Sequence, residues 1–245
     1  MSPFSRRNFL FASSGAAAGN LLAAGLAPAD EAGGNTFAGD AFAESGLVTG
    51  SLKPLKHKSI PGFLSAEQIA PHHMAHYGGA LKAYAAADGR LEQSFKEATP
   101  IDPAAYPTLK RLINSRGNSV VLHEMYFDGL APRAAEPGQD IRRAIAGRFG
   151  SLDAWADDFQ ASAKDAAGWA MLVRHPVNGR LYNVVSDEHS MGILWMAVPL
   201  VVIDVYEHAF YIDYQNRKAE YVEKFMTHID WDEADRRYRL ASKGA

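Results

Sequence analysis

The sequence predicts an α+β protein, with an N-terminal antiparallel helical hairpin and a C-terminal α/β domain that carries a small three-stranded antiparallel sheet. Helical patterns come first, at 65–89 and 104–115. Apolar runs of strand length follow at 168–173, 181–185 and 198–203. Since the strands come late and in close succession, we expect the sheet to belong to the second half of the chain.

Composition restricts the class of site. The chain has 245 residues, of which 47% are hydrophobic, enough for one compact unit or two small layered domains. A net charge of −3 gives no basic footprint for nucleic acid. The chain has no cysteine, which excludes disulfides, thiolate nucleophiles and cysteine-ligated zinc or iron–sulfur sites. Any metal must be held by His, Asp or Glu, donors that suit iron, manganese and also zinc.

The N-terminus carries an export pattern. Ser5-Arg6-Arg7-Asn8-Phe9-Leu10 is a twin-arginine motif, and the weakly apolar run 10–26 follows it. This run is short and rich in Gly and Ala, which argues against a permanent membrane span. Small-x-small cleavage candidates lie at 27–29 and 41–43. We therefore expect residues 1–51 to be a signal peptide and flexible linker, and the protein to reach the periplasm or the exterior through the twin-arginine export machinery.

The first domain is expected to span residues 52–133. Ser65-Ala66-Glu67-Gln68 is a capping box that begins a helix ending near Gly89. Four side chains recur at i, i+4 spacing and should share one face of this helix: His72, His76, Ala80 and Tyr84.

The helical region 104–115 is followed by Gly117 and Asn118, which we expect to break the chain before 119–132. Glu124 is an alternative oxygen ligand next to His123, but on a helix it points about 100° away. We therefore predict a solvated or interface charge at Glu124.

The second domain is expected to span residues 134–245. Amphipathic helices are predicted at 140–149 and 151–167, with Ser151 as an N-cap. Trp155 and Phe159 are four residues apart and should belong to the core.

Asp204 and His208 follow the apolar run 198–203 and are four residues apart. If a helix begins there, both side chains project from one face and can hold one ion. A buried carboxylate and imidazole are costly unless a metal or another partner compensates them. The alternative is an ordinary helix start, where Asp204 caps and His208 packs.

The run D-V-Y-E-H-A-F-Y-I-D-Y-Q-N-R, which begins at Asp204, closely resembles the D-V-W-E-H-A-Y-Y-x-x-Y-x-N-R signature of the iron/manganese superoxide dismutases. The resemblance extends over about residues 55–240. In the first domain, S-A-E-Q-I-A-P-H-H-M-A-H-Y resembles the family's first-ligand helix, which makes His72 a ligand and His76 the histidine that lines the substrate funnel. The run 119–132 resembles the second-ligand helix, with His123 as the ligand.

The resemblance implies one iron or manganese ion per subunit, held by His72, His123, Asp204 and His208. It also implies the family's activity, a ping-pong conversion of superoxide to O₂ and H₂O₂ by metal redox cycling. Most members place a Gln beside the metal-bound water. Ser119 is too short for that role, but His189 lies fifteen residues before Asp204, where a subset of the family places a His. The alternative for His189 is a loop histidine in the polar turn 187–190.

Two residues match positions that the family uses across its subunit interface. Glu207 would bond the partner subunit's His208, and Tyr211 the partner subunit's His76. The resemblance therefore implies a homodimer, or a tetramer built from it.

Three positions depart from the family's pattern. Ala80 stands where the family has a Tyr whose hydroxyl gates substrate and relays a proton, and Tyr77 and Tyr84 flank it. Tyr206 and Phe127 each stand where the family has a Trp. Loss of the relay should slow the peroxide-forming half-reaction more than it weakens metal binding. These departures leave a second hypothesis open: a metal-binding scaffold of this family whose redox activity is lost or altered.

Overall fold

The computed structural model describes residues 42–97, 102–133, 135–192 and 194–243. The twin-arginine motif, the apolar run 10–26 and the cleavage candidate at 27–29 lie outside the described residues, and the candidate at 41–43 lies partly outside them. None of the helices in the described part of the chain is both long and apolar enough to span a membrane.

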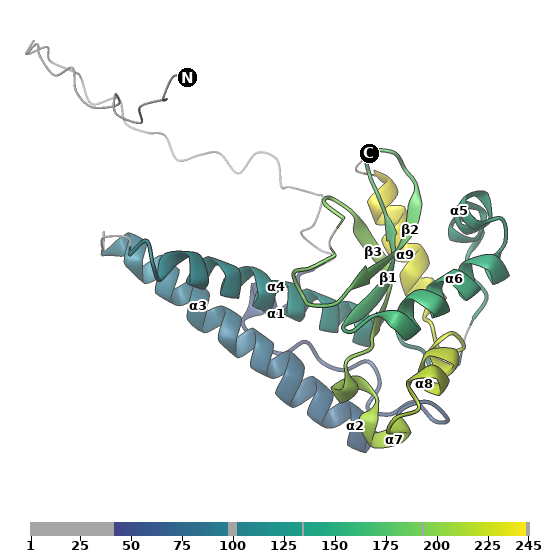
Figure 1. The fold of residues 1–245 in the computed structure, drawn as a ribbon, viewed down its shortest axis with the longest axis horizontal. Helices are drawn as coiled ribbons and strands as arrows, with labels where there is room; N and C mark the ends of the chain where they lie inside the picture. The colour runs from purple at the N-terminus through teal and green to yellow at the C-terminus, as the bar shows by residue number, and fades with distance from the viewer. Residues whose placement is uncertain (1–41, 98–101, 134, 193, 244–245) are drawn as a thin grey trace, which may run out of the picture. The chain divides into compact units, whose positions relative to one another are not determined.

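The first half of the described chain is a helical hairpin (Figure 1). A short helix α1 (Gly46–Thr49) precedes it. One arm runs without interruption through three helical segments, and the other arm is a single helix that packs along it. The first arm consists of α2 (Ala66–Pro71), the π-helix η1 (His72–Tyr77) and α3 (Gly78–Lys96), and the second is α4 (Tyr106–Asp128).

Two predictions about the ends of these helices are wrong. The first arm continues past Gly89 to Lys96, and α4 runs through Gly117 and Asn118 without a break. A Cβ on Gly117 would lie only 3.2 Å from the ring of Tyr84. The glycine thus lets the two arms approach closely, and this packing offsets its poor helix propensity.

Ser65 caps the first arm as predicted, accepting a hydrogen bond from the backbone N–H of Gln68 at 3.0 Å. A capping box also requires the side chain of Gln68 to bond back to the backbone N–H of Ser65, and it does not do so. It donates to the carbonyl of His208 at 2.6 Å and accepts from the N–H of Ile212 at 2.9 Å. Gln68 therefore ties the start of the hairpin to the segment after the third strand.

The π-helix changes which side chains face inward. A π-turn holds more residues than an α-turn, so the buried face moves forward by one position. His72, Tyr77 and Ala80 are buried, as are the neighbouring His73 and Leu81, whereas His76 is exposed and Tyr84 is half-buried. The predicted i, i+4 face through His72, His76, Ala80 and Tyr84 is therefore wrong.

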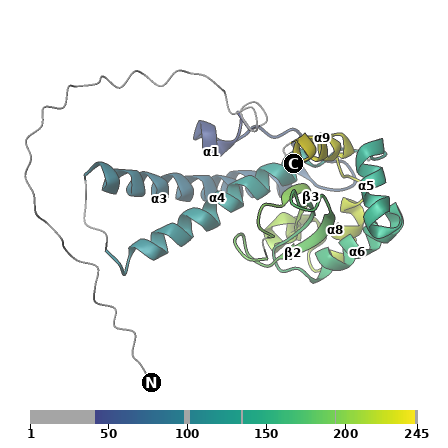
Figure 2. The ribbon, with the colours of Figure 1, turned by 90° about the horizontal axis from the view of Figure 1, so that it is seen from above.

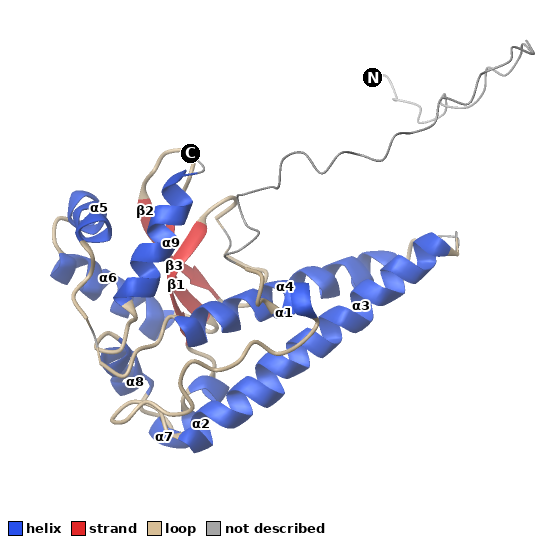
Figure 3. Ribbon diagram, turned by 180° about the vertical axis from the view of Figure 1, so that it is seen from behind, coloured by secondary structure: helices blue, strands red, loops and turns tan. Residues whose placement is uncertain are grey.

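The second half carries the sheet, and the strands of the described chain all lie there (Figure 3). The strand order is β2-β1-β3 and both pairings are antiparallel, which confirms the predicted sheet. The strands are β1 (Trp169–Arg174), β2 (Leu181–Ser186) and β3 (Val198–Asp204). All six residues of β1 are buried, as expected for a central strand.

Helices cover the sheet and complete the predicted α+β architecture. Helix α6 (Leu152–Asp165) packs on β1 and β2, whereas α4 and α9 (Trp231–Lys243) pack on β3. Figure 2 shows α4 passing from the hairpin to the strands. The remaining helices are α5 (Gln139–Phe149), the 3₁₀-helix η2 (Glu207–Ala209), α7 (Tyr211–Tyr214) and α8 (Lys218–Phe225).

The helix predictions before the sheet are confirmed. Ser151 accepts a hydrogen bond from the N–H of Ala154 at 3.0 Å and caps α6. Trp155 and Phe159 are fully buried in the core. The limits 52–133 and 134–245 for the two domains stay a prediction.

Candidate metal centre

Four side chains from remote parts of the sequence meet at one point. His72 comes from η1, His123 from α4, Asp204 from the end of β3 and His208 from η2. One ligand atom from each residue lies within 4.8 Å of the others. The Nε2 atoms of His72, His208 and His123 lie 3.1, 3.3 and 3.7 Å from Oδ2 of Asp204. The structure thus brings together the four residues predicted as ligands.

The backbone around Asp204 aims one carboxylate oxygen at the histidines. Asp204 is the last residue of β3 and pairs with Trp169 on β1. Its Oδ1 accepts the backbone N–H of Tyr206 at 3.0 Å, which leaves Oδ2 for the three imidazoles. The backbone carbonyl of Asp204 accepts the hydroxyl of Tyr221 at 2.8 Å. The prediction that one helix carries Asp204 and His208 is wrong, because Asp204 ends a strand and His208 lies in a 3₁₀ turn.

The imidazole of His123 has a defined tautomer. Its Nδ1–H donates to the carbonyl of Ser119 at 2.7 Å, so the lone pair is on Nε2. The Nε2 atoms of His123 and His208 are both buried, and neither has a hydrogen-bond partner among the described residues. A buried polar atom without a partner is costly, and a cation between these nitrogens would satisfy both.

The electrostatics of the cluster also fit a cation. Burial lowers the pKa of His72, and it lowers the pKa of His123 to about 3, so both rings are neutral. Burial alone would raise the pKa of the Asp204 carboxyl, but the neighbouring imidazoles of His208 and His72 hold it well below its usual range. The Nε2–Oδ2 separations of 3.1, 3.3 and 3.7 Å are those expected of ligand atoms that each lie about 2.1 Å from one ion.

His76 flanks the cluster on its exposed side. Its ring stacks on His208 with a centroid distance of 3.7 Å and an interplanar angle of 10°. Burial, together with the neighbouring His208, lowers the pKa of His76 to about 4. The neutral, exposed ring of His76 therefore lies beside His208 of the cluster.

His189 is half-buried and held by a specific contact, whereas Asp187 and Glu188 are exposed. Its Nδ1 accepts the indole N–H of Trp169 at 3.0 Å, and its ring centroid lies 6.3 Å from that of His123. His189 lies in a turn, as the loop alternative expects, but its ring is held by Trp169. Its expected role beside a metal-bound water stays a prediction.

Glu207 and Tyr211 lie on the surface. Glu207 is exposed, and Tyr211 keeps 51% of its surface accessible. Glu207 also lines a cavity of about 590 Å³ together with Tyr206 and His208. Their accessibility is compatible with an interface, and the predicted contacts to a partner subunit stay a prediction.

Tyr77 does not supply a hydroxyl in place of the tyrosine missing at Ala80. Its hydroxyl donates to Oε1 of Glu124 at 2.7 Å and accepts the backbone N–H of Lys53 at 3.0 Å. Ala80 itself is buried. Tyr84 lies against Gly117 on α4, one turn beyond Ala80.

Sequence reasoning missed the role of Glu124. The prediction of a solvated or interface charge is wrong, because Glu124 is buried and accepts hydrogen bonds from Tyr77 and from the N–H of Gly46. Its partners lie at remote sequence positions, so no local pattern marks them. The same holds for Trp169 and Tyr221, which orient His189 and Asp204.

Comparisons with known proteins agree with the fold and with this cluster. The family model for the C-terminal domain of iron/manganese superoxide dismutases matches residues 137–237. The chain is 32% identical over 189 residues to superoxide dismutase [Mn] 2 of Haloferax volcanii, covering 77% of this chain and 94% of that protein. It is 36% identical over 193 residues to superoxide dismutase [Fe] of Aquifex aeolicus, covering 77% and 90%. Superoxide dismutase [Fe] of Pyrobaculum aerophilum is 30% identical over 196 residues, covering 78% and 92%.

Proposed function

We propose that this chain, which belongs to the iron/manganese superoxide dismutase family, is an exported superoxide dismutase that converts superoxide to dioxygen and hydrogen peroxide. The observation that carries the proposal is the buried cluster itself. Three imidazoles and one carboxylate converge within 4.8 Å, and two of the imidazole nitrogens have no other partner among the described residues.

Iron or manganese fits the donor set, at one ion per subunit. Imidazole nitrogen and carboxylate oxygen suit both metals, and relatives of both kinds are similar to this chain. When bound, the ion would supply one-electron redox cycling, accepting an electron from one superoxide and returning it to the next.

The residues of the chain would prepare the site for a small anion. Only Asp204 brings a negative charge to the cluster, so a loaded cluster keeps a net positive charge that attracts superoxide. His76 is the exposed ring beside His208 and stands where substrate can arrive. The aromatic rings of Phe127, Trp169 and Tyr206 surround the histidines and limit the access of water.

His189 would hold a proton toward the cluster. In a neutral imidazole one nitrogen accepts and the other carries the hydrogen. Because Nδ1 of His189 accepts from Trp169, the proton of the neutral ring is on Nε2. His189 can therefore act as a hydrogen-bond donor beside the cluster, in the role that a Gln has in most of the family.

Export and assembly complete the proposal. The motif Ser5-Arg6-Arg7-Asn8-Phe9-Leu10 supports twin-arginine export to the periplasm or beyond, a route that carries folded proteins. The exposed Glu207 and Tyr211 support a homodimer in which each bonds a histidine of the partner.

A second candidate function is a metal-binding scaffold with altered redox activity. Ala80 offers no hydroxyl, and the hydroxyl of Tyr77 is engaged by Glu124 and Lys53. This arrangement favours slow proton delivery, and in the extreme it favours loss of the reaction.

Elemental analysis of the purified protein, paired with a superoxide-consumption assay on the same sample, separates these functions. Iron or manganese near one ion per subunit with strong activity supports the enzyme. Bound metal without activity supports the altered scaffold. Little iron or manganese would overturn the ligand assignment.

A further inference from the structure

The segment Ser45–Lys53 precedes the hairpin and lies against α4; we call it the N-terminal strap. It contains the short helix α1, whose N-cap Ser45 and first residue Gly46 are buried. Sequence analysis placed most of this segment in a flexible linker. In the structure it makes specific buried contacts with both arms of the hairpin.

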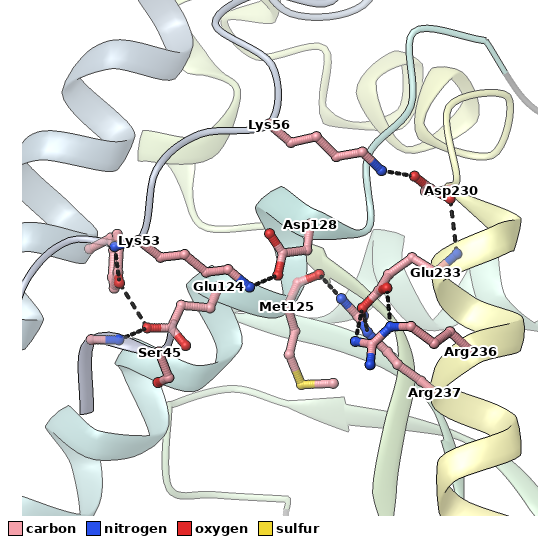
Figure 4. A network of polar contacts seen from close by, with 12 residues as sticks. Ser45, Lys53, Lys56, Glu124, Met125, Asp128, Asp230, Glu233, Arg236 and Arg237 are labelled. Atoms are coloured by element: carbon pink, nitrogen blue, oxygen red, sulfur yellow. Dashed lines mark hydrogen bonds and ion pairs between the residues drawn. The ribbon is translucent and has the colours of Figure 1, made fainter. Parts of the chain in front are cut away.

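The two ends of the strap meet at one carboxylate–phenol pair. Oε1 of Glu124 accepts the backbone N–H of Gly46 at 2.8 Å and the hydroxyl of Tyr77 at 2.7 Å. The same hydroxyl accepts the backbone N–H of Lys53 at 3.0 Å. The ammonium of Lys53 also pairs with Asp128 on α4 at 2.6 Å (Figure 4).

Gly46 is required by this close approach. A Cβ at that position would lie 2.9 Å from the hydroxyl oxygen of Tyr77 and 3.0 Å from both Cδ2 of Leu81 and the carbonyl oxygen of Ser51. The backbone of the strap is therefore pressed directly onto the hairpin, and no side chain fits between them.

Three of the residues that the strap contacts directly follow a histidine of the site. His73 follows His72 and donates from Nε2 to the carbonyl of Lys53 at 2.8 Å. Tyr77 follows His76, and Glu124 follows His123. The strap therefore contacts the helix turns that carry these histidines, through the residues next to them.

Tyr77 connects the strap to the cluster. Its ring faces that of His123 with a centroid distance of 6.2 Å and an interplanar angle of 22°. The hydroxyl at the other end of the ring is fixed by Glu124 and Lys53. Displacement of the strap would remove the N–H of Lys53 from this hydroxyl and the N–H of Gly46 from Glu124, and would so loosen the ring that packs behind His123.

We propose that the N-terminal strap is a positioning element of the metal cluster. Through Tyr77 and Glu124 it holds His123 and the π-helix η1 (His72–Tyr77) in place. The inference rests on the proposed function in one respect, that the cluster holds a metal ion. It also bears on processing: cleavage at either candidate site leaves the strap attached, and cleavage beyond Gly46 would remove the bond to Glu124. Retention of the metal by the exported protein would then depend on the segment next to its leader.

Substitutions at Glu124 and Tyr77 test this proposal in the metal-loaded full chain. Glu124→Leu removes the acceptor, Tyr77→Phe removes only the hydroxyl, and Glu124→Gln keeps an oxygen that can accept both bonds. The control is Lys56→Met, which breaks the ion pair with Asp230 just beyond the strap (Figure 4). The measurements are the rate of metal release to a chelator, the visible absorption of the bound ion and the midpoint of thermal unfolding.

We expect Glu124→Leu and Tyr77→Phe to release metal about tenfold faster than the wild type and to shift the visible absorption, as loss of a group that orients a ligand does. Glu124→Gln should keep the wild-type rate of metal release and the wild-type visible absorption, and Lys56→Met should change only the unfolding midpoint. If Glu124→Leu does not fold, Tyr77→Phe decides alone. Unchanged release and spectrum in Tyr77→Phe would overturn the proposal, whereas a wild type without metal would overturn the proposed function instead.

Discussion

The indole N–H of Trp169 donates to Nδ1 of His189 at 3.0 Å, while the backbone of Trp169 pairs with Asp204. One residue of the central strand β1 thus orients His189 and supports the strand end that carries the carboxylate of the cluster. We expect Trp169→Phe to lower turnover per bound metal by about tenfold, because the ring of His189 loses the contact that selects its tautomer.

The matched control is Trp155→Phe. Trp155, on α6, is equally buried, and its indole N–H donates to Oδ1 of Asn183 on β2 at 3.0 Å, away from the cluster. Trp155→Phe should lower the unfolding midpoint and leave turnover per metal unchanged. Equal turnover in both variants would contradict the role given to Trp169.

Removal of a ligand should empty the site. We expect His123→Ala and Asp204→Asn to lower iron or manganese from near one ion per subunit to near zero and to abolish superoxide consumption. His123→Ala leaves only three donors for the ion, and Asp204→Asn removes the negative charge of the site. Metal content by elemental analysis is the measurement. His175→Ala, at a half-buried histidine outside the cluster, is the control and should keep its metal. Chelation of the wild type should lower its unfolding midpoint by mass action.

Ala80 should make the rates of the two half-reactions differ. Pulse radiolysis is expected to show a fast dioxygen-forming step and a slower peroxide-forming step, because the second consumes protons and Ala80 has no hydroxyl to relay them. Tyr84→Phe tests whether the neighbouring hydroxyl contributes, and we expect it to change neither step. Equally fast steps in the wild type would mean that the absence of the tyrosine has no kinetic effect.

The exposed residues Glu207 and Tyr211 should stabilise the dimer. Glu207→Ala is expected to shift sedimentation equilibrium toward monomer and to lower metal content with it, since the bond to the partner subunit's His208 would be lost. Glu223→Ala, at an exposed carboxylate on α8 that pairs with Lys164, is the control and should sediment as the wild type does. A dimer of undiminished stability in Glu207→Ala would refute the assignment.

Glu233 should make stability depend on pH. Burial alone would raise the pKa of Glu233, but hydrogen bonds from Arg236 and the charge of Arg237 lower it below its ordinary value. A lowered carboxyl pKa stabilises the fold above the unfolded pKa of about 4.3, and this contribution is lost as pH falls through the lower folded value. We expect Glu233→Gln to cost about 2 kcal/mol of unfolding free energy at neutral pH.

Urea unfolding of the metal-free protein measures this cost. The difference between wild type and Glu233→Gln should be constant from neutral pH down to about 5 and shrink below the unfolded pKa. Glu220→Gln is the control, because its exposed carboxylate pairs with Arg217 on the surface and such pairs contribute little. A cost for Glu233→Gln that does not shrink in acid would indicate packing rather than charge.

Local patterns predicted much of the fold. The strands were recognisable because apolar runs of five or six residues with turn signals around them have few alternatives. Ser65 and Ser151 were recognisable as caps because a cap acts within three residues. The same locality explains the errors. Gly117 has poor helix propensity, yet α4 continues because the ring of Tyr84 on the other arm packs against it.

By itself, the sequence determined the architecture, the absence of cysteine ligands and the four residues expected to hold a metal. Only the tertiary structure decided how these residues are held. The π-helix His72–Tyr77 shifts the buried face by one residue. Glu124, predicted as a solvated or interface charge, is a buried acceptor for the N–H of Gly46 in the strap, and Trp169 selects the tautomer of His189. For Glu124 and His189 the physical reason is the same: the deciding contact joins residues that lie far apart along the chain, so no local pattern contains it.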